Sequence, residues 1–311
     1  MLSLRQVEAG HMGASLKAFV QAPPVRSRSI GRVADALERY APSSVEIVTD
    51  QSQADLVVLH VLGRFWRTWR EAAAIESKGQ QYAMVQYVLG STQVTDPWEW
   101  RNIWKRARLT WSYLDLPQAL IDSAKGYYKP GSGDWFYHSP LGVDADVFQP
   151  QALHRRFVMC SSGFARTSES VKEIAKAAAT VGREVFHLGP KLTLGPHVTF
   201  GENLTDQELA HRYSQCEFVS GLRRIEGFEL PAAEGLLCGA RPILFARSSG
   251  YDWYKPWGIY IEEGDRAHVQ RVLEYLFKQG ADPVTPKERA EAADVFSWAR
   301  VVGEFWKRCL A

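Results

Sequence analysis

The stretch FVSGLRRIEGFELPAAEGLLCGARPILF, residues 218–245, carries the clearest structural signal in the chain. Apolar runs at its two ends predict short buried strands, and Pro231 lies where the first turn of a helix tolerates proline. Gly239 follows the last helical residues, as is typical of a helix C-terminus. The stretch therefore predicts strand, loop, helix and strand, with Glu226 on the loop and Glu234 on the helix. Open α/β sheets bind ligands at loops that follow the carboxyl ends of parallel strands, so we expect a ligand site here.

Strand and helix patterns alternate along the whole chain of 311 residues. The nearly continuous apolar run Leu56–Leu62 fits a parallel strand that is buried on both faces. The second half begins with a strand pattern at 157–161 and ends with three helical patterns over 266–310. This alternation predicts doubly wound α/β domains, and the length suits two of them, which we place at 1–150 and 151–311.

Composition and charge exclude several classes of protein. The 37 Lys+Arg and 35 Asp+Glu give a net charge of +2, so bulk charge indicates neither a nucleic acid nor a membrane partner. No apolar run approaches the roughly 18 residues that a membrane span needs, and the first 15 residues lack the apolar region of a secretory signal. The four cysteines show neither metal-ligand spacing nor a disulfide framework. We therefore expect a cytoplasmic protein with no integral membrane segment and no metal site.

Candidate ligand residues lie at two further strand ends. His60 ends a strand of the first half, where such sheets present functional side chains, although a hydrogen-bonded core histidine has the same pattern. In the second half, a loop with Gly163 and Arg166 follows the first strand, and residues 167–168 are the expected cap of a helix that carries Lys172. Unpaired N–H groups at a helix N-terminus and nearby cations favour a phosphate, so this loop is a candidate phosphate site.

Two segments of the first half, 64–70 and 98–108, interleave arginine or lysine with tryptophan. Such residues can grip phosphate and stack on bases or sugars. The same pattern is typical of amphipathic helices whose tryptophans lie in the core and whose cations lie in water. Both interpretations remain open at this point.

The spacing of Glu226 and Glu234 within EGFELPAAE, followed by Gly239 and Pro242, is similar to a known signature. With LGVD at 141–144, it resembles the retaining sugar-nucleotide glycosyltransferases of family 4, and residues 157–310 resemble their C-terminal domain. The resemblance implies the α/β GT-B fold, in which two doubly wound Rossmann-like domains face each other across a cleft.

The resemblance also implies roles for individual residues. Glu226 and His60 are the expected catalytic residues, with Glu226 on the hydroxyls of the donor sugar, and Glu234 is expected to bind the ribose. The remaining donor-binding residues that it implies are Gly227, Phe228, Glu229, Leu230, Arg166, Lys172 and Gly163. Because the cations neutralise the donor diphosphate, neither a metal nor a cofactor is expected.

Three features depart from the family pattern. Glu229 stands where the family often has glycine, the Gly-Gly loop usual after the first strand is missing, and the spacing between Arg166 and Lys172 is looser than usual. Arg223 and Arg224 precede Glu226 and are further candidate cations.

The sequence thus predicts a retaining glycosyltransferase that moves a sugar from a nucleotide-diphosphate sugar to a hydroxyl of a glycan or small molecule. One alternative is a transferase that acts on hydroxylated bases of DNA, as virus-encoded enzymes do; its motivation is the Trp/Arg interleaving. Another is a non-catalytic protein with the GT-B fold that binds nucleotide sugars or carbohydrates.

Overall fold

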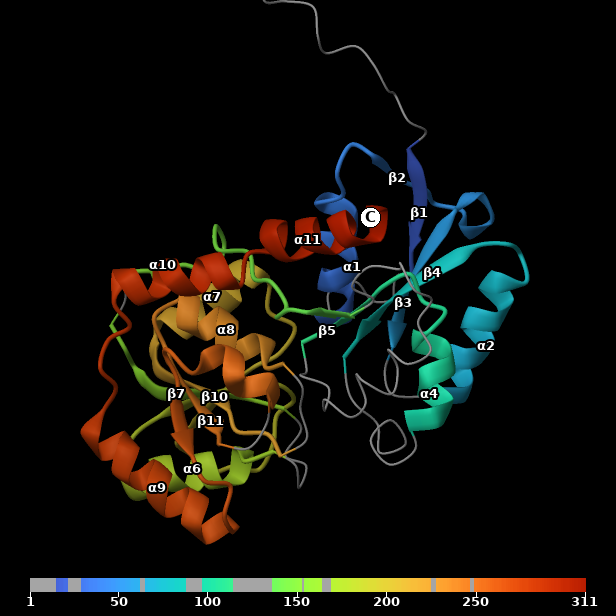
Figure 1. Ribbon diagram of the computed structural model, residues 1–311. Helices are drawn as coiled ribbons and strands as arrows, with labels where there is room; N and C mark the ends of the chain where they lie inside the picture. The colour runs from blue at the N-terminus through green and yellow to red at the C-terminus, as the bar shows by residue number, and fades with distance from the viewer. Residues whose placement is uncertain are drawn as a thin grey trace, which may run out of the picture.

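The protein is described by a computed structural model that covers residues 15–21, 29–61, 65–87, 97–113, 136–152, 154–163, 169–224, 228–246 and 249–311. It contains two six-stranded sheets, and every strand pair recorded in them is parallel. The fold is therefore α/β, with one sheet in each half of the chain (Figure 1).

The first sheet has the strand order β2-β1-β3-β4-β5-β6. Its strands are β1 (Leu16–Val20), β2 (Val45–Ile47), β3 (Leu56–Val61), β4 (Gln81–Gln86), β5 (Thr110–Ser112) and β6 (Phe136–His138). The second sheet has the order β12-β11-β10-β7-β8-β9. Its strands are β7 (Phe157–Ser162), β8 (Val185–Leu188), β9 (Val198–Gly201), β10 (Cys216–Gly221), β11 (Arg241–Phe245) and β12 (Ile259–Ile261).

Helices connect the strands and cover both sheets. Those of the first half are α1 (Ser29–Arg39), the 3₁₀ turn η1 (Gln51–Gln53), α2 (Phe65–Glu76) and α4 (Pro97–Trp104). Those of the second half are α6 (Val171–Thr180), α7 (Asp206–Ser214), α8 (Leu230–Leu237), the 3₁₀ helix η2 (Ser249–Tyr254), α9 (Arg266–Gln279), α10 (Pro286–Val295) and α11 (Trp298–Leu310). Thr205 and Glu208 have the Thr-x-x-Glu spacing that predicts a capping box, and this box is present at the start of α7.

The last helix, α11, returns to the first half of the molecule, where it lies beside α1 (Figure 1). The indole N–H of the fully buried Trp306 donates to the carbonyl of Leu37 at 3.0 Å. Phe305 packs on Trp111 with ring centroids 5.8 Å apart. Helix α11 therefore completes the core of the first sheet. The division of the chain into two domains at residue 150 stays a prediction.

The two Trp/Arg segments have different environments. On α4, Trp100 and Trp104 are fully buried in a cluster with β3 and β4, as expected for a core-facing amphipathic helix. On α2, Trp66 and Trp69 are 63% and 40% exposed, so the core interpretation is wrong for these two tryptophans. The difference arises because β3 and β4 bury the opposite face of α2, through Ala72 and Ile75.

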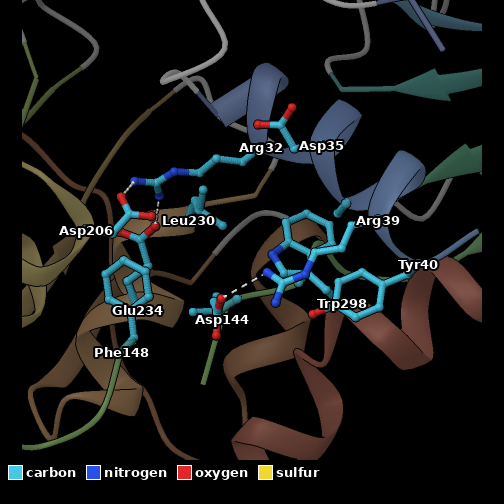
Figure 2. Close-up of a pocket in the computed structure, with 13 residues that line it drawn as sticks. Arg32, Asp35, Arg39, Tyr40, Asp144, Phe148, Asp206, Leu230, Glu234 and Trp298 are labelled. Carbon is cyan, nitrogen blue, oxygen red and sulfur yellow. Dashed lines mark hydrogen bonds and ion pairs between the residues drawn. The ribbon is translucent and has the colours of Figure 1, made fainter. Parts of the chain in front are cut away.

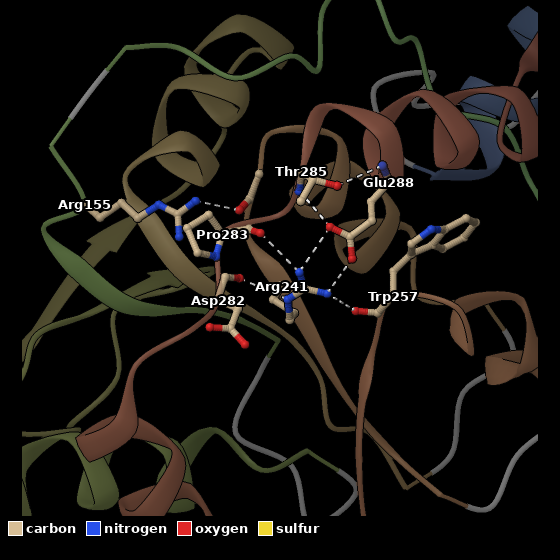
Figure 3. Close-up of polar contacts among 8 residues, drawn as sticks. Arg155, Arg241, Trp257, Asp282, Pro283, Thr285 and Glu288 are labelled. Atoms are coloured by element: carbon tan, nitrogen blue, oxygen red, sulfur yellow. Dashed lines mark hydrogen bonds and ion pairs between the residues drawn. The ribbon is translucent and has the colours of Figure 1, made fainter.

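Arg241, the first residue of β11, ties together three segments of the second half (Figure 3). Its guanidinium donates to the carbonyl of Trp257 at 2.9 Å and to the carbonyls of Asp282 and Pro283 at 3.1 and 3.3 Å. It also pairs with the carboxylate of Glu288, the N3 residue of the α10 capping box. This network fixes the path of the chain from β11 to α10.

Candidate functional site

The strand order of the second sheet reverses between β7 and β10, which defines a topological switch point. Open α/β sheets bind ligands in the crevice outside such a point. Gly163 follows β7 and Arg223 follows β10, so both lie at this crevice. The segment before α6 is held there too, because the N–H of Ser170 donates to the carbonyl of Leu222 at 3.2 Å.

Gly163 occupies a position that accepts only glycine. Its φ is +124°, and a Cβ there would lie 2.5 Å from the carboxylate of Glu169. The carbonyl of Gly163 accepts a hydrogen bond from Nε2 of the buried His187 at 3.2 Å, and Nδ1 of that ring lies 2.9 Å from the hydroxyl of Ser161. His187 therefore fixes the backbone of Gly163, the first residue of the predicted phosphate loop.

Arg223 bridges the two sides of the crevice. Its Nε lies 3.0 Å from the buried carboxylate of Glu229, and its Nη2 donates to the hydroxyl of Ser162 at 3.4 Å. Arg224 points elsewhere, since it pairs with Glu263 at 2.8 Å and stacks on the ring of Phe245. Of the two candidate cations that the sequence offered, the structure brings Arg223 to the crevice and keeps Arg224 away.

Helix α8 presents its N-terminus to the same crevice. Glu229 is its N-cap residue, and its side chain makes no capping bond. Leu230 and Pro231 form the first turn, as the sequence predicts. Gly235 allows α8 to lie against β10, because a Cβ there would come within 2.7 Å of Val219. The close approach places Glu234 in the interior, with only 3% of its surface exposed.

Glu234 lies in a cluster that joins the two halves of the molecule (Figure 2). One carboxylate oxygen pairs with Arg32 of α1, and the other accepts a hydrogen bond from Tyr213 at 3.2 Å. Arg32 also pairs with Asp206, the first residue of α7. A cavity of about 170 Å³ adjoins the cluster, and Leu230 and Phe148 lie on its wall.

The charge of Glu234 is set by opposing effects. Burial raises the pKa of Glu234 from 4.5 to about 7, and it is the larger effect. The positive charge of Arg32 acts in the opposite direction and lowers this pKa, while Asp206 raises it further. Glu234 therefore changes its charge near neutral pH.

A row of aromatic rings links His60 of the first half to Phe228 of the second half. Its Nδ1 lies 2.6 Å from the hydroxyl of Tyr87. The ring of Tyr87 lies 6.3 Å from that of Tyr113, which in turn lies 5.8 Å from Phe228 across the boundary between the halves. Burial lowers the pKa of His60 from 6.5 to about 4, and a hydrogen bond with the backbone of Gln21 opposes part of this shift. The imidazole is therefore neutral at pH 7.

Three of the predicted site residues, Glu226, Gly227 and Arg166, lie outside the described part of the chain. Lys172 is exposed on the first turn of α6. The predicted cap of that helix at 167–168 is wrong, because α6 begins at Val171 with Ser170 as its N-cap. An isolated antiparallel bridge joins Glu169 to Arg223 just before this helix.

Sequence reasoning missed Arg32, Tyr213 and His187. Arg32 lies in a segment, 30–40, whose apolar residues recur at helical spacing, and within it Arg32 resembles an ordinary surface cation. Its partners are about 170 to 200 positions away, so only the packing of the two halves reveals its role. His187 had a usable signal, because it is a polar residue at the end of a strand pattern and precedes Gly189.

The described residues contain no group of three or more His, Cys, Asp or Glu side chains that could hold a metal ion. Within the same ranges, no helix is long and apolar enough to cross a membrane.

The arrangement of the two sheets is the GT-B fold of known glycosyltransferase structures. Sucrose-phosphate synthase from Thermosynechococcus elongatus superposes with a TM-score of 0.69 at 13% identity, over 95% of this chain and 99% of that one. Anabaena HepE in complex with UDP and glucose gives 0.69 at 12%, over 96% and 100%. AviGT4, a glycosyltransferase involved in avilamycin A biosynthesis, gives 0.58 at 11%, over 95% and 97%.

At these sequence identities, the similarity to the three solved structures establishes the fold of this protein alone. No protein-family model matches the sequence, and no curated protein matches it either.

Proposed function

We propose that this protein is a retaining glycosyltransferase that uses a nucleotide-diphosphate sugar as donor. The observation that carries the proposal is the convergence of Gly163, Arg223 and the N-terminus of α8 at the switch point of the second sheet. Similarity in fold to HepE, whose structure holds UDP and glucose, supports the donor class.

In this proposal the diphosphate lies between Gly163 and Arg223. Transfer breaks the bond between the anomeric carbon and the diphosphate and forms a bond from that carbon to the acceptor oxygen. Negative charge builds on the departing diphosphate, and a fixed cation and a helix N-terminus stabilise it. Arg223 supplies this cation, together with Arg166 and Lys172, so neither a metal nor a cofactor is needed.

Glu234 binds the ribose hydroxyls, since a carboxylate accepts two hydrogen bonds with charge assistance. The oxygen that would receive them is held by Arg32, so nucleotide binding exchanges one partner for another. Arg32 keeps a second carboxylate, Asp206, and therefore is not left without a counter-charge when Glu234 is released.

The sugar-binding residues in this proposal are Glu226, with the backbone of Gly227 and Phe228, and His60 approaches from the first half. A neutral imidazole such as that of His60 can donate to, or accept from, a sugar hydroxyl. The acceptor, a glycan or small molecule, binds on the side of the first sheet.

The test is to incubate the protein with UDP- and GDP-sugars and an acceptor panel, to identify products by mass spectrometry, and to assign their anomeric configuration by proton NMR. We expect a transferred sugar with retained anomeric configuration, and no product from Glu226→Ala. Donor binding without transfer to any acceptor would instead support the non-catalytic alternative.

One observation favours a second candidate acceptor, DNA with hydroxylated bases. Trp66 and Trp69 are exposed on α2, and their rings meet edge to face at 6.2 Å beside Arg67 and Arg70. Such a surface can stack on bases. A gel shift that weakens steeply with salt and is lost on replacing both tryptophans by alanine would support DNA as acceptor. The absence of a shift at low salt would exclude it.

A further inference from the structure

A second and larger cavity, of about 710 Å³, lies between β6, η2 and α11. We call it the β6–α11 groove; the residues on its wall include Tyr137, His138, Trp253, Trp257, Glu304 and Arg308. It shares no described lining residue with the cavity beside Glu234. Its volume is in the range of small-molecule sites.

Aromatic rings form much of the wall. His138 and Trp253 meet with their centroids 4.8 Å apart and their planes inclined by 50°. The indole N–H of Trp253 donates to the carbonyl of Tyr113 at 2.9 Å, which fixes the orientation of the ring. The hydroxyl of Tyr137 donates to the carbonyl of Val301 at 3.0 Å. These rings are held in place by the protein before any ligand arrives.

The polar side chains of the groove carry no excess of either charge. Glu304 pairs with Arg308 at 2.9 Å, and both lie on α11. Arg300 pairs with Asp294 at 2.7 Å, and Asp252 pairs with Lys255 at 3.0 Å. Two acidic and two basic residues line the groove, so it offers donors and acceptors without attracting a strongly charged ligand.

Trp257 adds an unused donor. It is 4% exposed, and its indole N–H has no hydrogen-bond partner among the described residues. Its carbonyl is held by Arg241 at 2.9 Å, so the backbone behind this wall of the groove is fixed (Figure 3). Buried polar groups normally have a partner, which makes this donor a feature that needs an explanation.

We propose that the β6–α11 groove binds a neutral sugar unit of an oligosaccharide. A sugar ring combines apolar C–H faces, which pack on aromatic rings, with a rim of hydroxyls, which bond to paired charged groups. Trp253 of the groove bonds to Tyr113, which in turn contacts Phe228 of the second half. The proposal goes beyond the proposed function and does not depend on it, because sugar binding here requires no transfer.

The test is saturation-transfer NMR of the full chain with maltose, cellobiose, lactose and chitobiose, in the presence of excess UDP to occupy the donor site. We expect at least one disaccharide to bind, and its affinity to fall about tenfold or more in Trp253→Ala and in Glu304→Gln. Glu291→Gln, an exposed carboxylate on α10 outside the groove, is the matched control and should bind as the wild type does. Glu226→Ala, which should lose transfer, should also keep this binding.

Three results would overturn the proposal: no binding of any disaccharide, binding that Trp253→Ala and Glu304→Gln leave unchanged, or displacement of the sugar by inorganic phosphate. The last result would assign the groove to an anion. Because Glu304 lies on the surface of a helix, Glu304→Gln should fold even if Trp253→Ala does not.

Discussion

At the scale of single residues, Glu234 shows how burial and charge combine at the candidate site. The carboxylate is removed from water, yet it has a cation from the other half of the molecule and a tyrosine hydroxyl as partners. Burial outweighs the cation, so the pKa of Glu234 rises to about 7. The residue that is proposed to hold the ribose is therefore only partly ionised at neutral pH.

This pKa predicts how UDP binding depends on pH. Ribose hydroxyls bond best to the carboxylate, which predominates above pH 7, so affinity should fall by up to about tenfold for each pH unit below 7. Isothermal titration calorimetry between pH 5.5 and 8.5 measures the affinity for UDP. Glu234→Gln should bind more weakly and lose this dependence, leaving only the titration of the phosphate itself. Arg32→Met should move the midpoint to higher pH, because Arg32 lowers the pKa of Glu234.

Arg223 yields a sharper comparison, since its neighbour is a matched control. Arg223→Met removes the cation at the crevice and should weaken UDP binding by about 10- to 100-fold, the effect of one charge-assisted hydrogen bond. Arg224→Met removes the adjacent cation, which is engaged with Glu263, and should leave UDP affinity within about twofold. Equal losses in the two variants would contradict the placement of the diphosphate at Arg223.

Sequence alone could locate the candidate site but not complete it. The proline in the first turn of α8 and the capping box of α7 are local signals, and both predictions are confirmed. Arg32 could not be assigned, because its contacts with Glu234 and Asp206 form only when distant segments pack. The choice between Arg223 and Arg224 likewise depends on which direction each side chain takes at the end of β10.

At the scale of elements, the alternation of strands and helices could be predicted because parallel strands buried on both faces have continuous apolar runs. Helix α2 shows the limit of this reasoning. One of the two interpretations of the sequence placed its tryptophans in the core, but Ala72 and Ile75 form the buried face, and Trp66 and Trp69 remain exposed. Hydrophobicity indicated an amphipathic helix without showing which face packs.

The hydrogen bonds of Arg241 predict that replacing this residue destabilises the second half. Arg241→Met removes hydrogen bonds to three carbonyls and to Glu288, so we expect the free energy of unfolding to fall by about 3 kcal/mol. Urea unfolding followed by circular dichroism measures it. Lys287→Met, which removes an exposed ion pair on the same α10, should change stability by less than about 1 kcal/mol. A loss below about 1 kcal/mol in Arg241→Met would show that the network contributes little.

At the scale of the whole molecule, the two halves are joined by more than the chain connection near residue 150. Helix α11 completes the core of the first sheet, Arg32 pairs with residues of the second half, and Tyr113 contacts Phe228. These contacts fix the first half, which carries His60, against the second half, which carries Glu234. No sequence pattern in α11 indicated that it packs on the distant half.

The packing of α11 predicts that its core residues stabilise the first half. Trp306→Ala should lower the free energy of unfolding by about 3–5 kcal/mol, because it leaves a cavity where a fully buried ring had packed. Trp306→Phe keeps most of the volume and loses the bond to Leu37, and should cost about 1 kcal/mol. A small effect of the alanine variant would mean that α11 is not part of this core.

The central claim is that the crevice of the second sheet binds a nucleotide-diphosphate sugar. Isothermal titration calorimetry of the full chain with UDP- and GDP-sugars tests it most directly. The account predicts one-site binding of at least one donor, weakened at least tenfold in Arg223→Met and unchanged in Arg224→Met. Absence of binding for every donor tested would contradict it.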